Sequence, residues 1–292
     1  MNPVSLIKKI GIIPAFYKIK RRILVKDDNI TSLIACNGAY DYLQKYRYVL
    51  DLPLTMDKQP ATSNTIWTIW LQGVDNAPEL VKKCIASMVA QHGENVIVLD
   101  NSNVAKYVEI PEYITRKWQA GIIPNAHYTD VLRTLLLAKH GGVWIDATTW
   151  LFAPVPAYIR QAGIFVFQGF PIANVMASNW FISAQENNPI MLKMKNLLLE
   201  YWKKENRLVS YSIFHLFFTM AVRTEKELWE AAPYFNDVNC KMLQRELFDS
   251  FNEIRLEQIK QMSPIQKLSY KFSNEEFNKK GTFYDALTVQ LF

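Results

Sequence analysis

The clearest pattern in the chain is a short apolar run, a helical pattern and a second apolar run. Residues 65–73 (TIWTIWLQG) are β-branched and aromatic and end in glycine, which predicts a buried strand entering a loop. In residues 77–93, Pro78 stands in a first helical turn and Gly93 follows the last one, which predicts a helix. Residues 95–100 (NVIVLD) predict a second buried strand. A strand, a helix and a strand of these lengths form a βαβ unit, which indicates an α/β fold with a parallel sheet covered by helices.

Both predicted strands end in polar side chains. Ligands of open parallel sheets bind at the carboxyl ends of the strands. Here those ends carry Gln72 with Gly73, and Asp100 with Asn101. We therefore expect Gln72 and Asp100 to lie near a ligand.

The chain divides into two regions. Residues 1–63 contain a basic leader, a helical pattern over residues 33–50 and a polar connector with prolines, and they predict an N-terminal helical extension and linker. Residues 64–292 predict a catalytic domain whose C-terminal part, from about residue 188, is dominated by helical patterns. With 292 residues, half of them apolar, the chain can bury a large core.

Positive charge is concentrated at the N-terminus. The formal net charge is +6, and seven Lys or Arg precede the first acid, Asp27. Residues 1–26 are too interrupted by charge to span a bilayer and lack the cleavage site of a secretory signal. Two interpretations stay open: a solvated helix broken at Pro14, or an amphipathic helix on an anionic membrane surface. The three cysteines lack metal-ligand and disulfide spacing, which favours a reducing compartment and hence the cytoplasm, free or on the inner membrane face.

A second constellation surrounds a predicted helix over residues 125–140. Asp130 and Arg133 are three residues apart, so they share one face of this helix and can converge on one ligand. The glycine pair 141–142 stops the helix and lets the chain turn sharply into a short strand. That strand carries Asp146 to its carboxyl end, where a ligand could bind.

This constellation suits a nucleotide diphosphate sugar. A departing diphosphate needs positive charge, which a divalent cation on carboxylate oxygen, Arg133, or both can supply. An oxygen site with few protein ligands suits Mg²⁺ or Mn²⁺. The alternative is structural: Asp130 and Arg133 form an ion pair that closes the helix, and Asp146 caps a turn.

The order of these residues resembles the DXD sugar-binding glycosyltransferases of family 32, and especially their bacterial branch, the capsular polysaccharide synthesis proteins. The resemblance includes IWTIWLQGVDNAPELVKKCI, VIVLDNSNVAKYVEIPEYI, NWFISAQENNPIM and SPIQKLSYK, in this order over roughly residues 60–272. It implies a GT-A fold, with a mixed, mostly parallel sheet flanked by helices. It also implies a nucleotide-sugar donor (UDP-sugars favoured) and a divalent metal, Mn²⁺ or Mg²⁺. It also implies transfer with retention to an oligosaccharide or lipid-linked glycan of a growing capsular polysaccharide or exopolysaccharide.

The resemblance also implies roles for residues around the second constellation. Asp130 and Arg133 would contact the sugar and phosphates of the donor, and Asn179 would lie near the transferred sugar. Asp146 would be the first acid of the DXD element, whose third position here is Thr148. Asp146 and Thr148 are therefore the expected metal positions, but a hydroxyl is a weak, neutral ligand. Three alternatives stay open: the metal is held by Asp146 and the donor phosphates alone, by an extra ligand from elsewhere as well, or not at all.

Residues at both ends of the matched region complete the implied donor site. Trp67, Trp70 and Gln72 would lie near the nucleotide base. Lys267 and Lys271, four apart on an expected helix, fall in a recurring C-terminal motif where they would clamp the diphosphate. The alternative for the two lysines is a solvated helix face.

Several further residues each have two interpretations. His127 either touches donor phosphate or is an exposed first-turn histidine. His215 is either a core histidine or a metal ligand. Trp180, Tyr201 and Trp202 either flank an acceptor sugar or pack in the core.

The sequence thus predicts a glycosyltransferase. No carboxylate pair at suitable spacing offers a nucleophile, which favours front-face attack by the acceptor without a covalent intermediate. One alternative is a catalytically silent subunit that binds nucleotide sugar or polysaccharide, suggested by the missing second acid. Another is a nucleic-acid binder, suggested by net charge alone; nucleic acid is not an expected partner, because the basic residues cluster in the leader and no known motif is present.

Overall fold

The computed structural model of the chain describes residues 7–8, 10–17, 28–54, 56, 59–168 and 175–290. In the labels used here, η marks a 3₁₀ helix, except for η6, which is a π-helix. The elements are, in order, α3 (Asp28–Leu43), η1 (Gln44–Asp51), β1 (Ile66–Ile69), η2 (Val74–Asn76), α4 (Glu79–His92), η3 (Gly93–Asn95), β2 (Val96–Leu99), η4 (Val104–Lys106), α5 (Glu112–Gln119), α6 (Asn125–His140), β3 (Gly142–Ile145), β4 (Thr149–Leu151), α7 (Ala157–Arg160), β5 (Ile164–Val166), β6 (Phe181–Ala184), α8 (Pro189–Lys204), α9 (Ile213–Val222), α10 (Lys226–Glu230), η5 (Asn239–Lys241), α11 (Met242–Arg245), α12 (Glu253–Met262), β7 (Ile265–Lys267), α13 (Asn274–Phe277), α14 (Phe283–Asp285) and η6 (Ala286–Gln290).

Five strands form the central sheet in the order β2-β1-β3-β6-β5. β1 pairs in parallel with both β2 and β3, so that Trp67 lies in register with Ile97 on one side and Trp144 on the other. β6 runs antiparallel to β3 and to β5. The expected fold class, a mixed and mostly parallel sheet flanked by helices, is confirmed, and the predicted βαβ unit is β1-α4-β2.

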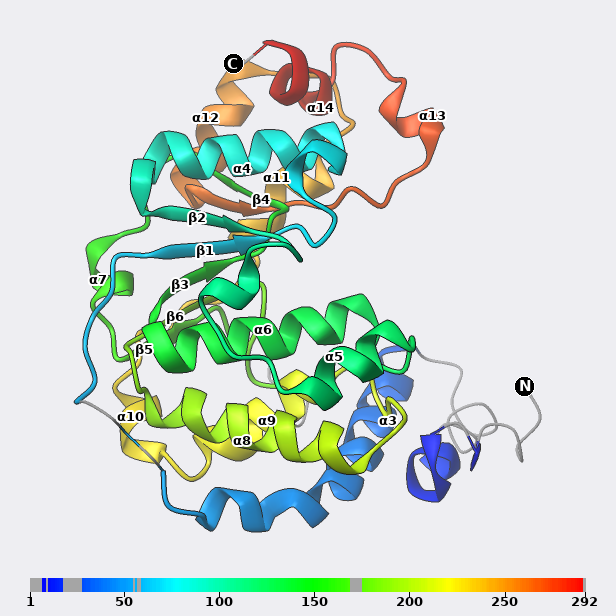
Figure 1. Ribbon diagram of the computed structural model, residues 1–292. Helices are drawn as coiled ribbons and strands as arrows, with labels where there is room; N and C mark the ends of the chain where they lie inside the picture. Colours follow the sequence, from blue (N-terminus) through cyan, green and yellow to red (C-terminus); the bar gives the residue numbers. More distant parts are fainter. Residues whose placement is uncertain are drawn as a thin grey trace.

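Helices cover both faces of this sheet (Figure 1). α4 packs against β2 on one face, whereas α6 contacts β3 and β6 on the other face. α8 packs behind α6 and α9 packs on α8, so α6 is enclosed between the sheet and a second helical layer. This position explains why most side chains of α6 are buried.

The glycine pair after α6 turns the chain directly into β3. Gly141 and Gly142 have φ angles of 60° and 93°, a region that favours glycine. A methyl group on Gly142 would meet the carbonyl oxygen of Thr65, and one on Gly141 would meet the backbone at Glu186. This close approach places β3 immediately beside the helix that precedes it.

β4 and β7 form a separate two-stranded antiparallel sheet. Thr149 pairs with Lys267 and Leu151 pairs with Ile265. The expectation that Lys267 and Lys271 lie on a helix is therefore wrong: Lys267 ends a strand, and Lys271 follows in an irregular segment. The four-residue spacing of two lysines mimicked a helix face, whereas the strand depends on a partner far away in the sequence.

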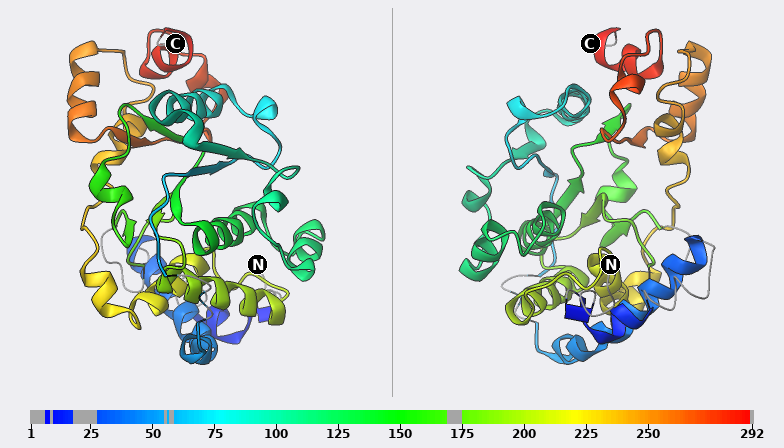
Figure 2. Two further views of the ribbon diagram at one scale, coloured as in Figure 1. Left: turned by 60° about the vertical axis from the view of Figure 1, so that its left-hand side comes forward. Right: turned by 90° about the vertical axis from the view of Figure 1, so that its right-hand side faces the viewer.

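The N-terminal helices share the largest hydrophobic core with the C-terminal part of the chain. α3 packs on α9 and η1 packs on α8. The ring of Tyr46 in η1 lies edge-on to those of Tyr201 and Phe217, with centroids 5.6 and 6.1 Å apart. Tyr201 and Trp202 are fully buried, so the core interpretation holds for both. Figure 2 shows α12 and α14 at the end of the molecule opposite to α3.

Most of the basic leader lies outside the described residues. In its described part, Ile10 is buried and packs with Ile7 and Ala15, whereas Ile12 and Phe16 are exposed. The two interpretations of residues 1–26 stay predictions. Within the described ranges, no helix combines the length and the apolar character needed to cross a membrane.

Candidate active site

A cavity of about 710 Å³ lies where β1 and β3 end. Its size is within the range of roughly 300–1,000 Å³ that is typical of small-ligand sites. Segments from α6 and from the region after β7 complete its walls. The sequence-predicted site residues that line it are Trp70, Gln72, Asp130, Arg133, Asp146, Thr148, Asn179, Lys267 and Lys271, and Trp180, although mostly buried, lines it as well.

Asp146 lies in the cavity directly after β3. Its backbone N–H donates to the carbonyl oxygen of Trp180 at 2.9 Å, which extends the pairing of β3 with β6 by one residue. Trp144, two residues earlier and hence on the same side of the strand, donates its indole N–H to Oδ1 of Asp146 at 3.0 Å. The side chain of Asp146 is thereby held in one place with 25% of its surface exposed.

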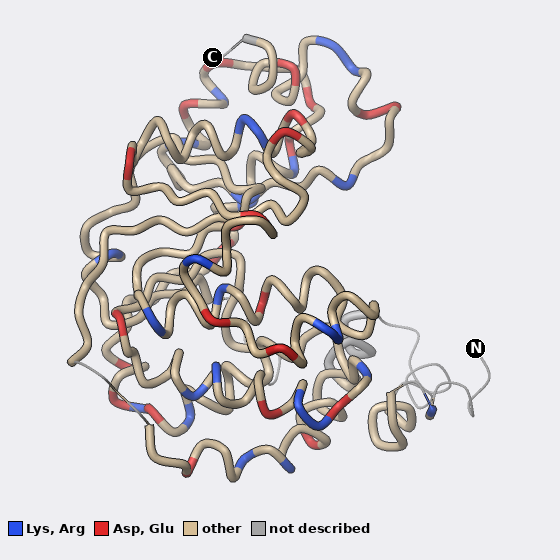
Figure 3. Tube along the Cα trace, viewed as in Figure 1, with Lys and Arg blue, Asp and Glu red and all other residues tan. Residues whose placement is uncertain are grey.

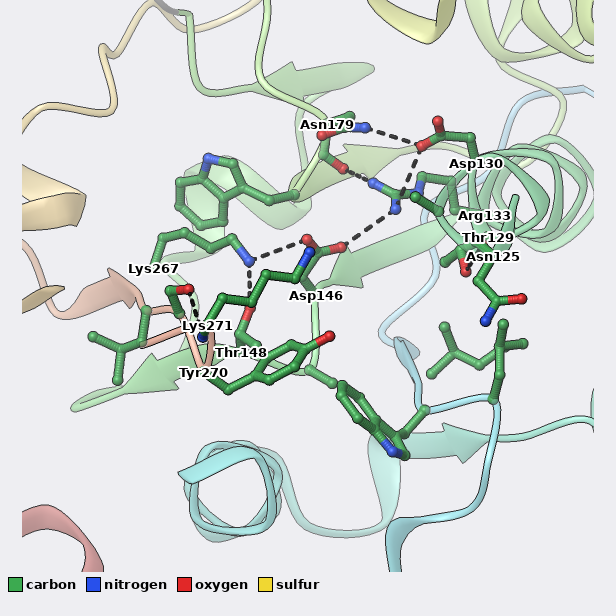
Figure 4. A pocket seen from close by; sticks show the side chains of 18 of the residues that line it. Asn125, Thr129, Asp130, Arg133, Asp146, Thr148, Asn179, Lys267, Tyr270 and Lys271 are labelled. Atoms are coloured by element: carbon green, nitrogen blue, oxygen red, sulfur yellow. Dashed lines mark hydrogen bonds and ion pairs between the residues drawn. The ribbon is translucent and has the colours of Figure 1, made fainter. Parts of the chain in front are cut away.

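Arg133 reaches Asp146 from α6 (Figure 4). Its Nη2 lies 3.4 Å from Oδ1 of Asp146 and 3.5 Å from Oδ1 of Asp130. Its Nη1 donates to the carbonyl oxygen of Asn179, and its guanidinium carbon lies 4.8 Å from the centroid of the Trp144 ring. These partners surround a planar cation that has little freedom to turn, so Arg133 presents its charge in a fixed direction.

Asp130 supports Arg133 from behind. It is buried, and its Oδ1 accepts a hydrogen bond from the side-chain amide of Asn179 at 2.9 Å. Burial raises the pKa of Asp130 to about 6, and Asp146 adds to the shift, although Arg133 opposes it. Asp130 and Asn179 thus orient the guanidinium.

The pKa of Asp146 shifts in the opposite direction. Burial disfavours its charged form, but Lys267 and Arg133 outweigh burial and lower its pKa. The Nζ of Lys267 lies 3.2 Å from Oδ2 of Asp146 and also donates to Oγ1 of Thr148. Asp146 is therefore an ionised carboxylate held between two cations, as Figure 4 shows.

The two tryptophans of the first strand face opposite ways. Trp70 lines the cavity and meets the ring of Tyr270 edge-on, with centroids 5.3 Å apart. Trp67 is buried away from the cavity, where its indole N–H donates to the carbonyl oxygen of Gly141 at 2.8 Å. The sequence contains the signal for this difference, because side chains three residues apart on a strand point to opposite faces.

Asp100 does not line the cavity either. Its carboxylate accepts hydrogen bonds from the backbone N–H groups of Ser102 at 2.7 Å and Asn103 at 3.1 Å, and so closes the turn after β2. The side-chain and backbone hydrogen bonds from Ser102 lower the pKa of Asp100. Asp100 does lie at the end of a strand, as predicted, but its side chain forms hydrogen bonds within its own turn.

His127 is buried and is not among the residues that line the cavity, so its interpretation as an exposed first-turn histidine is wrong. Its Nδ1 lies 3.4 Å from Oδ2 of Asp130. Burial lowers its pKa to about 4, and repulsion from His215 and Arg133 acts in the same direction. Burial likewise lowers the pKa of His215 to about 4. Both histidines are neutral near pH 7 and add no charge beneath Arg133.

The lining residues that were not predicted from the sequence include Trp144, Tyr211, Lys241 and Tyr270. Trp144 could have been found from strand alternation, because it precedes Asp146 by two residues. Tyr270 stands inside the KLSYK motif that was already singled out. Tyr211 and Lys241 come from segments that carry no local signal.

The two oxygen atoms expected to bind a metal are hydrogen-bonded to a lysine. Among the residues that the structure describes, no group of three or more His, Cys, Asp and Glu side chains could hold a metal ion. The two expected ligands, Asp146 Oδ2 and Thr148 Oγ1, both accept from the ammonium group of Lys267. As the residues are arranged here, neither oxygen is free for a divalent ion, because an ion bound to them would have to displace the ammonium group.

Comparisons with known proteins give a family, a relative and similar solved structures. Residues 17–287 match the family described as capsular polysaccharide synthesis protein. A protein named O-glycosyltransferase braB, from Annulohypoxylon truncatum, is 30% identical over 166 residues, which cover 50% of this chain and 39% of that protein. The match thus spans well under two thirds of the relative's length.

Two solved structures are also similar at low identity. One, titled PaToxG Glycosyltransferase, is 18% identical and aligns over 89% of this chain and 97% of its own, with a TM-score of 0.41. The other, titled as a transferase mutant, is 14% identical and aligns over 59% of this chain and 86% of its own, with a TM-score of 0.32.

Proposed function

Because the chain belongs to the family of capsular polysaccharide synthesis proteins, we propose that it is a glycosyltransferase that moves a sugar from a nucleotide diphosphate to a glycan hydroxyl. One observation carries the proposal. Arg133 and Lys267 flank the carboxylate of Asp146, at 3.4 and 3.2 Å, beyond the carboxyl end of β3. Ligands of such sheets bind at this edge, and fixed positive charge is what a departing diphosphate requires.

The charge of the cavity supports a phosphorylated donor. Four cationic side chains line it, Arg133, Lys241, Lys267 and Lys271, against the two acids Asp130 and Asp146. Elsewhere in the described chain, basic and acidic residues are interspersed, as Figure 3 shows. A local excess of cations in a concave site favours a compact anion over the long polyanion that a nucleic-acid binder would hold.

The cavity wall at the end of β1 favours a donor that carries a nucleoside next to its diphosphate. Trp70 and Tyr270 present aromatic rings there, and Gln72 adds an amide. Asn76 donates its amide to the backbone oxygen of Gln72 at 2.8 Å, which holds this segment in place. An aromatic surface beside amide groups suits a planar base with hydrogen-bonding edges, and we propose UDP-sugars as the donors to test first.

The reaction follows from these contacts. The acceptor hydroxyl oxygen forms a bond to the anomeric carbon while the bond from that carbon to the β-phosphate oxygen breaks, and the electron pair leaves with the diphosphate. Arg133, Lys267 and Lys271 neutralise the charge that develops on the departing oxygen. The acceptor proton passes to a departing phosphate oxygen on the same face of the sugar.

Retention at the anomeric carbon is the outcome that this mechanism predicts. Within the described lining, Asp130 and Asp146 both interact with Arg133, so neither is free to attack as a nucleophile. Attack and departure on one face then give retention without a covalent enzyme intermediate. Trapping of a glycosylated Asp130 or Asp146 by mass spectrometry would contradict this route.

The acceptor is proposed to be a capsular polysaccharide or exopolysaccharide chain, or its lipid-linked precursor. Family membership motivates this proposal. Tyr211 supports it, because its ring is 71% exposed at the cavity and offers a surface on which a sugar can stack.

We further propose that the chain works on the cytoplasmic face of an anionic membrane through residues 1–26. Ile12 and Phe16 are 73% and 58% exposed, next to the basic part of this leader. Deletion of residues 1–26 should release the protein from vesicles that contain phosphatidylglycerol. Equal binding of both forms would refute this attachment.

The test of the function is a transfer assay with a panel of UDP- and GDP-sugars and oligosaccharide acceptors. Arg133→Ala and Asp146→Ala should each lower turnover by about 10²–10³-fold, as does loss of one group that stabilises transition-state charge. Asp51→Ala, an exposed acid on η1, is the matched control. Unchanged turnover in both site variants would remove the site assignment, whereas donor binding without transfer under all conditions would favour a catalytically silent binding subunit.

A further inference from the structure

The position of Lys267 is set by backbone pairing. β7 pairs with β4 so that Lys267 lies opposite Thr149, and the backbone N–H of Leu268 donates to the carbonyl oxygen of Thr148 at 2.8 Å. The chain between Asp146 and Thr149 forms a tight turn, closed by the N–H of Thr149 donating to the carbonyl oxygen of Asp146 at 2.9 Å. The base of the Lys267 side chain is thereby fixed to the turn that follows β3.

The ammonium group of Lys267 sits between the two side chains that the resemblance assigns to a metal. It lies 3.2 Å from Oδ2 of Asp146 and also donates to Oγ1 of Thr148. A lysine ammonium has three donors, so two are used here and one remains. Because Lys267 lines the cavity and is 19% exposed, the remaining donor is available to an anion in the cavity.

The second oxygen of Asp146 is also occupied. Oδ1 accepts from the indole N–H of Trp144 at 3.0 Å and lies 3.4 Å from Nη2 of Arg133. A divalent ion on Asp146 would therefore have to displace Lys267 and would stand close to a second cation. Like charges at such distances repel strongly where water is partly excluded.

Together, Lys267 and Arg133 carry the two positive charges that a divalent cation would bring to the diphosphate. We propose that the ammonium of Lys267 takes the place of that cation, and that this chain binds its nucleotide donor and transfers the sugar without a divalent metal. The inference rests on the proposed glycosyltransferase function, which it deepens by naming the cation that serves the leaving group. A threonine at position 148 suits this arrangement, because its hydroxyl accepts a hydrogen bond from the ammonium group without adding a second negative charge next to Asp146.

The experiment measures UDP binding by calorimetry, and turnover of an active UDP-sugar, in excess EDTA and in excess Mn²⁺. For the wild type, we expect the affinity for UDP and the turnover to change by less than about threefold between the two conditions. In EDTA, Lys267→Ala should bind UDP about tenfold or more weakly, because the substitution removes a charge-assisted hydrogen bond. Its turnover should fall by about 100-fold or more, because the charge on the leaving diphosphate is no longer stabilised. Added Mn²⁺ that restores UDP binding to Lys267→Ala but leaves the wild type unchanged would support the assignment directly.

Two variants serve as controls. Lys267→Arg keeps a positive charge and should retain more UDP affinity than Lys267→Ala, and Lys279→Ala removes an exposed lysine outside the cavity lining and should match the wild type. The comparison of wild type in EDTA and Mn²⁺ needs no variant, so it tests the proposal even if Lys267→Ala does not fold.

The outcomes separate this inference from the function on which it rests. Wild-type binding or turnover that disappears in EDTA and returns with Mn²⁺ overturns the role of Lys267 and leaves the glycosyltransferase function intact. Full activity of Lys267→Ala in EDTA overturns it as well. A wild-type chain that neither binds UDP or GDP nor turns over any nucleotide sugar, with or without Mn²⁺, overturns the proposed function itself.

Discussion

The buried carboxyl of Asp130 makes a quantitative prediction about stability. Its pKa is raised from 3.8 to about 6, chiefly by burial. As the pH rises between these values, the unfolded chain releases the proton of this group while the folded chain keeps it. The folded state therefore binds more protons, and its stability falls across this window and levels off above it. The change in this pKa from 3.8 to about 6 corresponds to about 3 kcal/mol, at about 1.4 kcal/mol per tenfold change in the ionisation constant.

Asp130→Asn removes this dependence. The amide is neutral in both states and can still meet the side chain of Asn179, which bonds Asp130 at 2.9 Å. Urea unfolding at about pH 4 and about pH 7.5 should show the variant gaining about 3 kcal/mol relative to the wild type at the higher pH. Taking the difference between the two proteins largely cancels groups that titrate in the same range and lie away from Asp130.

Asp51→Asn provides the control, because Asp51 is exposed on η1 and its replacement should leave the pH profile parallel to that of the wild type. A difference between Asp130→Asn and the wild type that stays constant from low to high pH would refute the reasoning. A stability gain of the variant that is larger at low pH would also refute the reasoning, because the folded state would then stabilise the ionised carboxylate of Asp130.

Three further predictions follow from single contacts. Folded His127 has a pKa lowered to about 4, so this group should contribute a loss of stability as the pH falls from about 6.5 toward 4, opposite in sign to the contribution of Asp130. His127→Gln should lack this contribution in acid unfolding curves. Gly142→Ala should cost about 2 kcal/mol or more and lower Tm in calorimetry, because Gly142 has a φ of 93° and a methyl group there would meet the oxygen of Thr65. Tyr211→Ala should raise KM for the acceptor up to about tenfold in steady-state kinetics while leaving the affinity for UDP unchanged, if the exposed ring stacks on the acceptor sugar. A change in UDP affinity instead would place the ring on the donor.

Local patterns were sufficient for the elements that build the centre of the fold. β1, α4 and β2 follow from two apolar runs and a helix with Pro78 and Gly93 at its ends, and the structure confirms all three. The proximity of Asp130 and Arg133 follows from helical spacing alone. These features depend on residues that are neighbours in the sequence, so propensity and periodicity predict them.

Side-chain direction needed more than the identification of a strand or a helix. Trp67 and Trp70 belong to one predicted strand, but the sheet sends Trp67 into the core and leaves Trp70 at the cavity. His127 shares the face of Asp130 on α6, yet the layer behind α6 buries it. Which face meets solvent depends on what packs against it, and that information lies in other parts of the chain.

Sequence patterns predict the βαβ unit, the helix that carries Arg133 and the acid at the end of β3. What lies beside Asp146 depends instead on how distant parts of the chain pack together. β7 is three residues long and forms against β4, from which it is separated by most of the C-terminal half of the chain. So short a strand has little intrinsic preference and exists because its backbone groups find partners there. That non-local pairing, rather than any local pattern, brings Lys267 to the position where a metal was expected.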